Sequence, residues 1–160
     1  MSAYIKSLDS NHLVSVGDEG FFNRSGSSDW TYNGSEGVDF EAFLRLPTID
    51  FGTLHLYPED WGKGSDDSWA TQFILDHINA AKTIGKPVIL EEYGYRDLNQ
   101  RKRIYQSWLD VVYNNDAAGD MVWMLASKSY QYNDGFIIDE TSPAFDVISP
   151  HIARMNQKNL

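Results

Sequence analysis

The chain has 160 residues and 42% apolar side chains, enough to bury a core of ordinary domain size, so we expect one folded domain over residues 1–160. Its formal charge of −10 argues against a nucleic-acid partner and an anionic membrane surface, because both would repel it. Cysteine is absent, which excludes a disulfide framework, a thiolate metal site and a cysteine nucleophile. Five Trp, nine Tyr and eight Phe suit either a core rich in aromatic side chains or a surface on which sugar rings stack.

The sequence shows no segment that would direct the chain to or through a membrane. Residues 1–6 lack the apolar core of a signal peptide, and no stretch approaches the roughly 20 apolar residues that span a bilayer. We therefore expect a soluble chain with no membrane partner, whose compartment is left open by these residues.

The first predicted strand covers residues 12–17, a short β-branched run that leads into an acidic turn at residues 18–20. Residues 23–36 follow as a polar stretch rich in Ser and Gly that contains Trp30. We expect this stretch to be an extended surface loop. Loops of that length usually carry function or are disordered.

The middle of the chain alternates helix and strand signals. A short helix is predicted over residues 40–46, and a strand over residues 51–57 ends at Pro58. Between residues 67 and 84, apolar side chains recur at helical spacing, and Gly85 is placed to stop that helix.

The last part of the chain continues the alternation. The patterns predict a strand over residues 86–94, an amphipathic helix over 99–113, a strand over 119–125 and a closing helix over 142–155. Four strands that alternate with helices of this length indicate βαβ units and an α/β fold with a parallel sheet. In such folds the functional site lies where the carboxyl ends of the strands converge.

Each predicted strand ends in side chains that can take part in catalysis or binding: Asp18 and Glu19, then His55 and Tyr57, then Glu91 and Glu92, then Trp123. His55 and Tyr57 are two residues apart and therefore share one face of their strand. Glu91 and Glu92 are adjacent, so a regular strand would point them to opposite faces. We expect one of them at the site and a structural ion pair for Glu91, with Arg96 as one candidate partner.

Four motifs at these strand ends carry a resemblance to a known family. They are Val14-Ser-Val-Gly-Asp-Glu-Gly-Phe21, Thr53-Leu-His-Leu-Tyr-Pro-Glu-Asp-Trp-Gly62, Lys86-Pro-Val-Ile-Leu-Glu-Glu-Tyr-Gly94 and Met121-Val-Trp-Met-Leu125. In this order they resemble strands five to eight of the family 5 glycoside hydrolases, in the β-mannanase branch. The resemblance covers nearly the whole chain and implies half of a (β/α)8 TIM barrel, with four parallel strands alternating with helices.

The resemblance also implies an activity, that of a retaining endo-β-1,4-mannanase without a cofactor. The family's nucleophile is the glutamate that precedes an aromatic residue and a glycine, which corresponds to Glu92. The His and Tyr that line the family's cleavage subsites correspond to His55 and Tyr57, and the Trp beneath the cleaved sugar corresponds to Trp123. β-Mannan or a related polysaccharide is then the expected partner, and the resemblance implies a secreted or extracellular location.

Part of the family's site has no counterpart in these residues. A full barrel needs about 250 residues and eight strands. The family's acid/base glutamate follows an asparagine, and no Asn-Glu dipeptide occurs here. Retaining glycosidases use two carboxyl groups about 5 Å apart, so Glu92 alone is expected to give weak or no hydrolysis. A half-barrel would also expose strand edges, and we expect two copies to close an eight-stranded barrel as a homodimer.

Other side chains are secondary candidates. Glu19 is a candidate for substrate binding and the nearest alternative proton donor in the chain. Trp61 and Trp30 lie in polar loops and are candidate platforms for outer sugar units. Asp66 and Asp67 match no calcium-binding loop, so no metal site is predicted.

Two other functions stay open. The chain is alternatively a non-catalytic carbohydrate-binding or self-assembling half-barrel module that keeps the aromatic cleft without turnover. A flavodoxin-like nucleotide binder is disfavoured, because no Gly-rich phosphate loop follows any strand.

Overall fold

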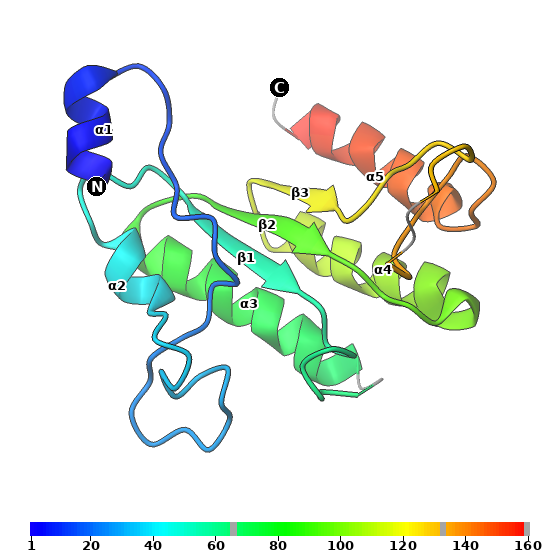
Figure 1. The fold of residues 1–160 in the computed structure, drawn as a ribbon, viewed down its shortest axis with the longest axis horizontal. Helices are drawn as coiled ribbons and strands as arrows, with labels where there is room; N and C mark the ends of the chain where they lie inside the picture. Colours follow the sequence, from blue (N-terminus) through cyan, green and yellow to red (C-terminus); the bar gives the residue numbers. More distant parts are fainter. Residues whose placement is uncertain (65–66, 132–133, 159–160) are drawn as a thin grey trace.

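Three parallel strands form the sheet in the computed structural model, which describes residues 1–64, 67–131 and 134–158 (Figure 1). β1 spans Gly52–Leu56, β2 spans Val88–Tyr93 and β3 spans Gly119–Val122, with β2 in the middle. The three arrows point the same way, so the carboxyl ends of the strands share one edge of the sheet. The strands predicted over residues 51–57, 86–94 and 119–125 are confirmed, as is the α/β class.

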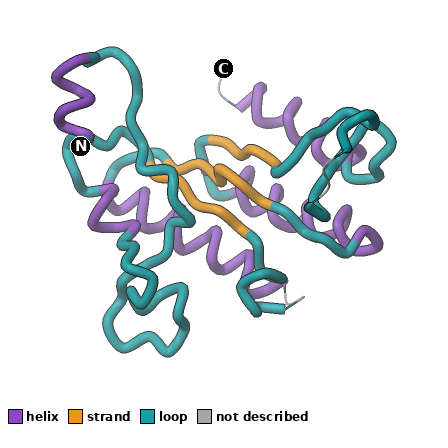
Figure 2. Tube along the Cα trace, viewed as in Figure 1, coloured by secondary structure: helices purple, strands orange, loops and turns teal. Residues whose placement is uncertain are grey.

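The described residues also form five helices: α1 (Ser2–Leu8), α2 (Phe40–Leu44), α3 (Asp67–Ile84), α4 (Leu98–Asn114) and α5 (Phe145–Lys158). α3 packs against β1 and β2, α4 packs against β3, and α5 lies beside α4 (Figure 2). The four predicted helices are confirmed, α3 with the predicted bounds and the other three with shifted ends, whereas α1 was not predicted.

Local signals explain where the long helices begin and end. The carboxylate of Asp97 accepts the N–H of Asn99 at 2.9 Å, which satisfies a donor that a helix start leaves unpaired. Gly85 follows α3 with a φ of +84° and donates to the carbonyl of Ala81 at 2.8 Å. Glycine adopts this left-handed backbone without steric cost, so α3 ends where its position predicted.

The core lies between the sheet and the helices that cover it. The strand side chains of the hydrophobic core, all almost fully buried, are Leu54, Leu56, Val88, Leu90 and Tyr93. Tyr93 contacts Tyr105 and Trp108 of α4 edge to face, at centroid distances of 5.1 and 6.3 Å. Burial of each large apolar side chain contributes roughly 1.5–3 kcal/mol, so this layer holds the strand ends in place.

Residues 12–17 do not form a strand of the sheet, so the prediction of a fourth strand there is wrong. The N–H of Val14 donates to the Asp50 carboxylate at 2.6 Å, and its carbonyl accepts the Asp50 N–H at 2.8 Å. Gly17 has a φ of +68°, which interrupts the extended backbone, and Val16 is exposed. The segment has strand-forming residues, but the backbone of Val14 bonds to Asp50, two residues before β1, rather than to a strand.

Residues 23–36 form a loop, as predicted, and this loop folds back on itself. The N–H of Phe22 donates to the carbonyl of Thr31 at 3.0 Å, and Asn23 and Asn33 form an isolated antiparallel bridge. The backbone of the loop is therefore paired near its base.

Candidate active site

Two carboxylates, an imidazole and a phenol meet where β1 and β2 end. The hydroxyl of Tyr57 donates to Glu92 Oε2 at 2.8 Å, and His55 Nδ1 lies 3.7 Å from the same oxygen. The other nitrogen of the ring, Nε2, lies 3.1 Å from Glu91 Oε2. The side chains of His55, Glu91 and Glu92 are 15%, 27% and 30% exposed, so a ligand can reach them from solvent. We refer to these four residues as the strand-end cluster.

A β-bulge places both glutamates on one face of the sheet. β1 and β2 pair residue by residue as far as Leu90, but His55 then pairs with Glu92, so β2 holds one extra residue at Glu91. The pairing of β2 with β3 shifts between Leu90 and Tyr93 as well. Both of these apolar residues are buried, so the two glutamates between them face away from the core. The prediction of opposite faces is wrong because it assumed a regular strand.

Glu91 has a different partner from the predicted one. Arg96 forms its ion pair with Asp60, whereas Glu91 contacts His55. The predicted pair of Glu91 with Arg96 is therefore wrong, and the bulge that turns Glu91 toward the imidazole is the physical reason. The imidazole lies between two carboxylates, and a protonated ring can donate to both, whereas a neutral ring can donate to only one.

Burial sets the protonation of two neighbouring groups. Burial, together with the hydrogen bond to Glu92, raises the pKa of Tyr57 well above its ordinary value, so the phenol keeps its proton and acts as the donor. Burial also raises the pKa of Asp18, and the carboxylates of Glu19 and Glu91 add to this effect. The Asp18 carboxyl is therefore easier to protonate than an ordinary aspartate. Glu19 is exposed, and its carbonyl accepts the N–H of His55 at 3.2 Å.

Trp123 directly follows β3 at the same edge of the sheet. It is 40% exposed, and its indole N–H donates to Asp134 Oδ2 at 2.8 Å. Its backbone N–H donates to the carbonyl of Tyr93 at 3.0 Å, which ties it to the end of β2. A large ring that is open to solvent and fixed at its edge has what a sugar-stacking platform requires. Asp134 was not among the predicted site residues, and the only signal for it in the sequence is the turn dipeptide Asp134-Gly135.

Trp30 and Trp61 are half-buried in a packed group of rings, the loop aromatic cluster, formed by Phe21, Trp30, Trp61, Trp69 and Phe73. Phe21 contacts both Trp30 and Trp61 edge to face at 5.1 Å. Trp61 also lies 6.3 Å from the ring of Tyr57, so the loop aromatic cluster adjoins the strand-end cluster. The structure thus gives both indoles packing partners, and their part in binding sugar stays a prediction.

The carboxylate of Asp29 fastens the loop over residues 23–36 to these rings. It accepts the indole N–H of Trp69 at 2.9 Å and the hydroxyl of Thr31 at 2.8 Å, and it forms an ion pair with Lys63. Burial alone would raise the pKa of Asp29, but the hydrogen bonds from these groups lower it to about 2. Asp29 is therefore a fixed negative charge at neutral pH that holds the loop in place.

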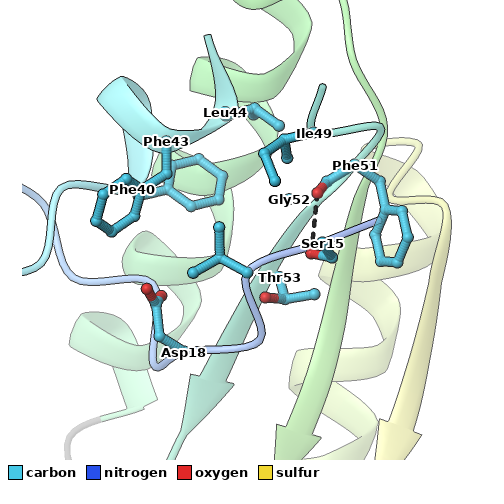
Figure 3. A pocket seen from close by; sticks show the side chains of 10 residues that line it. Ser15, Asp18, Phe40, Phe43, Leu44, Ile49, Phe51, Gly52 and Thr53 are labelled. Carbon is cyan, nitrogen blue, oxygen red and sulfur yellow. Dashed lines mark hydrogen bonds between the residues drawn. The ribbon is translucent and has the colours of Figure 1, made fainter. Parts of the chain in front are cut away.

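A separate small pocket lies between α2 and β1 (Figure 3). Phe40 and Phe43 line its α2 side, and the hydroxyl of Ser15 donates to the carbonyl of Phe51 at 3.0 Å on the opposite side. The cavity measures about 10 Å³, room for about one water molecule. It is too small for a sugar and belongs to the packing of α2 on the sheet.

The described ranges 1–64, 67–131 and 134–158 contain no group of three His, Asp or Glu side chains arranged to hold a metal ion. Within the same part of the chain, every helix is too short or too polar to cross a bilayer. Asp66, one of the acids considered for calcium, lies outside the described residues. Asp67 accepts the indole N–H of Trp108 at 2.9 Å.

Three comparisons with known proteins bear on this arrangement. A family model described as "GH family 5 beta-mannosidase-like" matches residues 1–121. The probable mannan endo-1,4-beta-mannosidase C of Aspergillus terreus is 39% identical over 99% of this chain, and the matched part is 42% of that protein. The mannan endo-1,4-beta-mannosidase A of Aspergillus aculeatus is also 39% identical over 99% of this chain and is covered to 42%.

The solved structures agree. The endo-1,4-beta-mannanase from Rhizomucor miehei superposes on 98% of this chain with a TM-score of 0.92 and 48% identity, and this chain covers 44% of it. The fold is therefore part of a (β/α)8 barrel. The chain spans less than half of the length of each of these relatives.

Proposed function

We propose that the strand-end cluster is the nucleophile side of a site that cleaves β-1,4-linked mannan. The proposal starts from the family to which this chain belongs, the glycoside hydrolase family 5 β-mannosidase-like family. The observation that carries the proposal is the hydrogen bond from Tyr57 to Glu92, beside His55, at the shared edge of the parallel strands. A partly exposed carboxylate in a fixed orientation is what a glycosidase nucleophile requires. The names of the relatives support mannan as the substrate class.

In this proposal Glu92 acts in the first step of a retaining reaction. A carboxylate oxygen attacks the anomeric carbon, the bond from that carbon to the leaving oxygen breaks, and a covalent glycosyl ester forms. Tyr57 orients the carboxylate by donating to Oε2, and His55 lies beside the same oxygen. Trp123 stacks against the sugar at the cleavage point. Water then cleaves the ester and restores Glu92.

A retaining site also needs an acid that protonates the leaving oxygen and later activates water. In the family this acid is a glutamate that directly follows an asparagine. The 160 residues contain no Asn-Glu dipeptide. We therefore propose that the chain by itself cleaves mannan weakly or not at all. Because mannan chains are too large to pass through a membrane, the proposed place of action is extracellular.

A second copy of the chain is the proposed partner for the open sheet. Among the described strands β3 pairs only with β2, and Met121 and Leu125 at this edge are 52% and 54% exposed. Two copies that place β3 of each against residues 12–17 of the other would cover these side chains. Sedimentation equilibrium at micromolar concentration should give twice the monomer mass. A monomer at every concentration would exclude this assembly.

The test of the nucleophile uses a substrate that does not need the acid. A dinitrophenyl β-mannobioside loses its leaving group without protonation, so release of dinitrophenolate in the first turnover reports on the nucleophile alone. We expect the unsubstituted chain to release dinitrophenolate and Glu92→Gln to release it at least about 100-fold more slowly. Glu140→Gln makes the same chemical change at an exposed residue and should keep the original rate.

Equal rates for the unsubstituted chain and Glu92→Gln would overturn the assignment of Glu92. Binding of mannohexaose without release of dinitrophenolate by either protein would favour the alternative, a carbohydrate-binding module without turnover. Release of dinitrophenolate with little reducing sugar from mannan is the result expected when the nucleophile is present and the acid is not.

A further inference from the structure

Arg96 lies outside the strand-end cluster but touches the segments that follow all three strands. Its guanidinium forms an ion pair with Asp60, after β1, and its Nε donates to the carbonyl of Asp134, after β3, at 3.3 Å. Its backbone N–H donates to Glu59 Oε2 at 2.5 Å. A single residue from the segment after β2 therefore links the loops around the candidate site.

One line of contacts runs from Arg96 to the nucleophile candidate. The central guanidinium carbon lies 4.2 Å from the ring centroid of Phe136. That ring lies so close to Gly94 that a Cβ there would meet it at 2.5 Å, and its centroid lies 5.1 Å from that of Tyr57. Tyr57 is the hydrogen-bond donor to Glu92. The ring of Phe136 therefore contacts both the guanidinium and the phenol.

A second line of contacts runs from Arg96 to the candidate platform. Asp134 accepts from Arg96 with its carbonyl and from the indole of Trp123 with its carboxylate. Gly135 has a φ of +92°, and a Cβ there would lie 3.0 Å from Arg96 Nε, so glycine lets the turn pass this close. Asp134 Oδ1 accepts the backbone N–H of Phe136 at 2.9 Å, so the carboxylate that holds Trp123 is also bonded to the residue whose ring stacks on Arg96.

Arg101 holds the backbone of the same segment by separate bonds. It is buried and donates to the carbonyl of Gly135 at 2.5 Å and to that of Ile137 at 2.9 Å. Loss of the Arg96 side chain should therefore leave the segment attached to α4. We propose that Arg96 is a positioning residue that sets the ring orientations of Tyr57 and Trp123. That these ring orientations favour sugar binding rests on the proposed function.

Fluorine NMR of the chain labelled with 5-fluorotryptophan tests the proposal without any sugar. The Trp123 line is identified by its absence from the spectrum of Trp123→Phe. Arg96→Ala removes the guanidinium, and Arg96→Lys keeps a charge facing Asp60 but loses the flat stacking group. We expect the Trp123 line to shift or broaden in both variants while the line of Trp108, in the core, stays unchanged.

The matched control is Arg103→Ala, which removes an exposed arginine of α4 that pairs with Asp67 at 3.8 Å. It should leave the Trp123 line in place. An unchanged Trp123 line in Arg96→Lys would overturn the proposal, and this variant decides if Arg96→Ala does not fold. Equal movement of all five Trp lines would show a general effect on stability and would also overturn it.

Titration with mannohexaose separates this proposal from the proposed function. In the unsubstituted chain the sugar should move the Trp123 line, and in Arg96→Lys the Kd should rise about tenfold. If the sugar leaves the line of the unsubstituted chain unmoved, the sugar-binding role of Trp123 fails, whereas the dependence of its orientation on Arg96 is judged by the spectra without sugar.

Discussion

The strand-end cluster and the loop aromatic cluster adjoin each other through Tyr57 and Trp61, yet they are built differently. In the strand-end cluster, polar groups pair with one another at a partly exposed sheet edge. In the loop aromatic cluster, rings pack edge to face, and Asp29 is bonded to groups of the surrounding loops and of α3. The first arrangement can exchange partners when a ligand arrives, whereas the second would lose packing.

Tryptophan shows the difference most clearly. Trp123 is held at its indole N–H and is 40% exposed, so it can receive a flat apolar partner. Trp61 has ring neighbours on several sides, including Phe21 and Trp69. The same residue type is therefore open to solvent in one region and packed among other rings in the other.

The largest expected effect lies on the packed side of this comparison. Trp61→Ala removes a ring that contacts four aromatic neighbours besides Tyr57, so the free energy of unfolding should fall by about 3 kcal/mol. Urea denaturation measures this loss. Trp123→Ala is the matched change on the open side and should cost less than about 1 kcal/mol. Equal losses would mean that the two regions do not differ in this way.

The next effect appears in acid. His77 is buried against Phe22, and its two nitrogens lie 2.7 Å from the carbonyls of Phe73 and Gly20. Burial lowers the pKa of His77 from 6.5 to about 4, so between these pH values the unfolded chain binds a proton that the folded chain does not. The free energy of unfolding should therefore be highest above pH 6.5 and fall by about 1.6 kcal/mol between pH 6.5 and pH 5.

Urea titrations at several pH values test this contribution. His77→Phe should lose the added pH dependence, whereas His12→Phe, which changes an exposed histidine, should keep it. The same pH dependence in His77→Phe as in the unsubstituted chain would contradict the assignment.

A smaller effect is expected for the anchor of the loop. Asp29→Ala leaves Lys63 and the indole of Trp69 without this acceptor, so the free energy of unfolding at pH 7 should fall by about 1.5 kcal/mol. Because the pKa of Asp29 is lowered to about 2, its contribution is complete above pH 4 and is lost as the pH falls toward 2. The difference between the two proteins should shrink over that range. A constant difference would show that the charge of Asp29 is not what holds the loop.

The smallest effect on stability is expected in the strand-end cluster. Glu92→Gln keeps an oxygen that can accept the hydrogen bond from Tyr57, so the free energy of unfolding should change by less than about 0.5 kcal/mol. The same urea titration measures it. A loss of several kcal/mol would show that Glu92 is part of the structural framework and would weaken the comparison between the two clusters.

Periodicity predicted much of the fold, because helical spacing and the stop at Gly85 are local properties of the chain. It failed for residues 12–17, since an apolar run becomes a strand only where a neighbouring strand accepts its hydrogen bonds. The sequence does contain a signal for the bulge. Leu90 and Tyr93 are both buried and three residues apart, whereas residues three apart in a regular strand lie on opposite faces. The contacts of Arg96 join distant loops, and no local pattern predicts them.

The claim that Glu92 is the nucleophile is tested most directly by trapping its covalent intermediate. A 2-deoxy-2-fluoromannobiosyl fluoride carries a leaving group that departs without an acid, and its fluorine at C2 slows the release of the sugar from the enzyme. We predict that intact-mass measurement finds one sugar per chain, that peptide mapping places it on Glu92, and that Glu92→Gln stays unlabelled. A label on Glu91 or Glu19, or no label on the unsubstituted chain, would contradict this account.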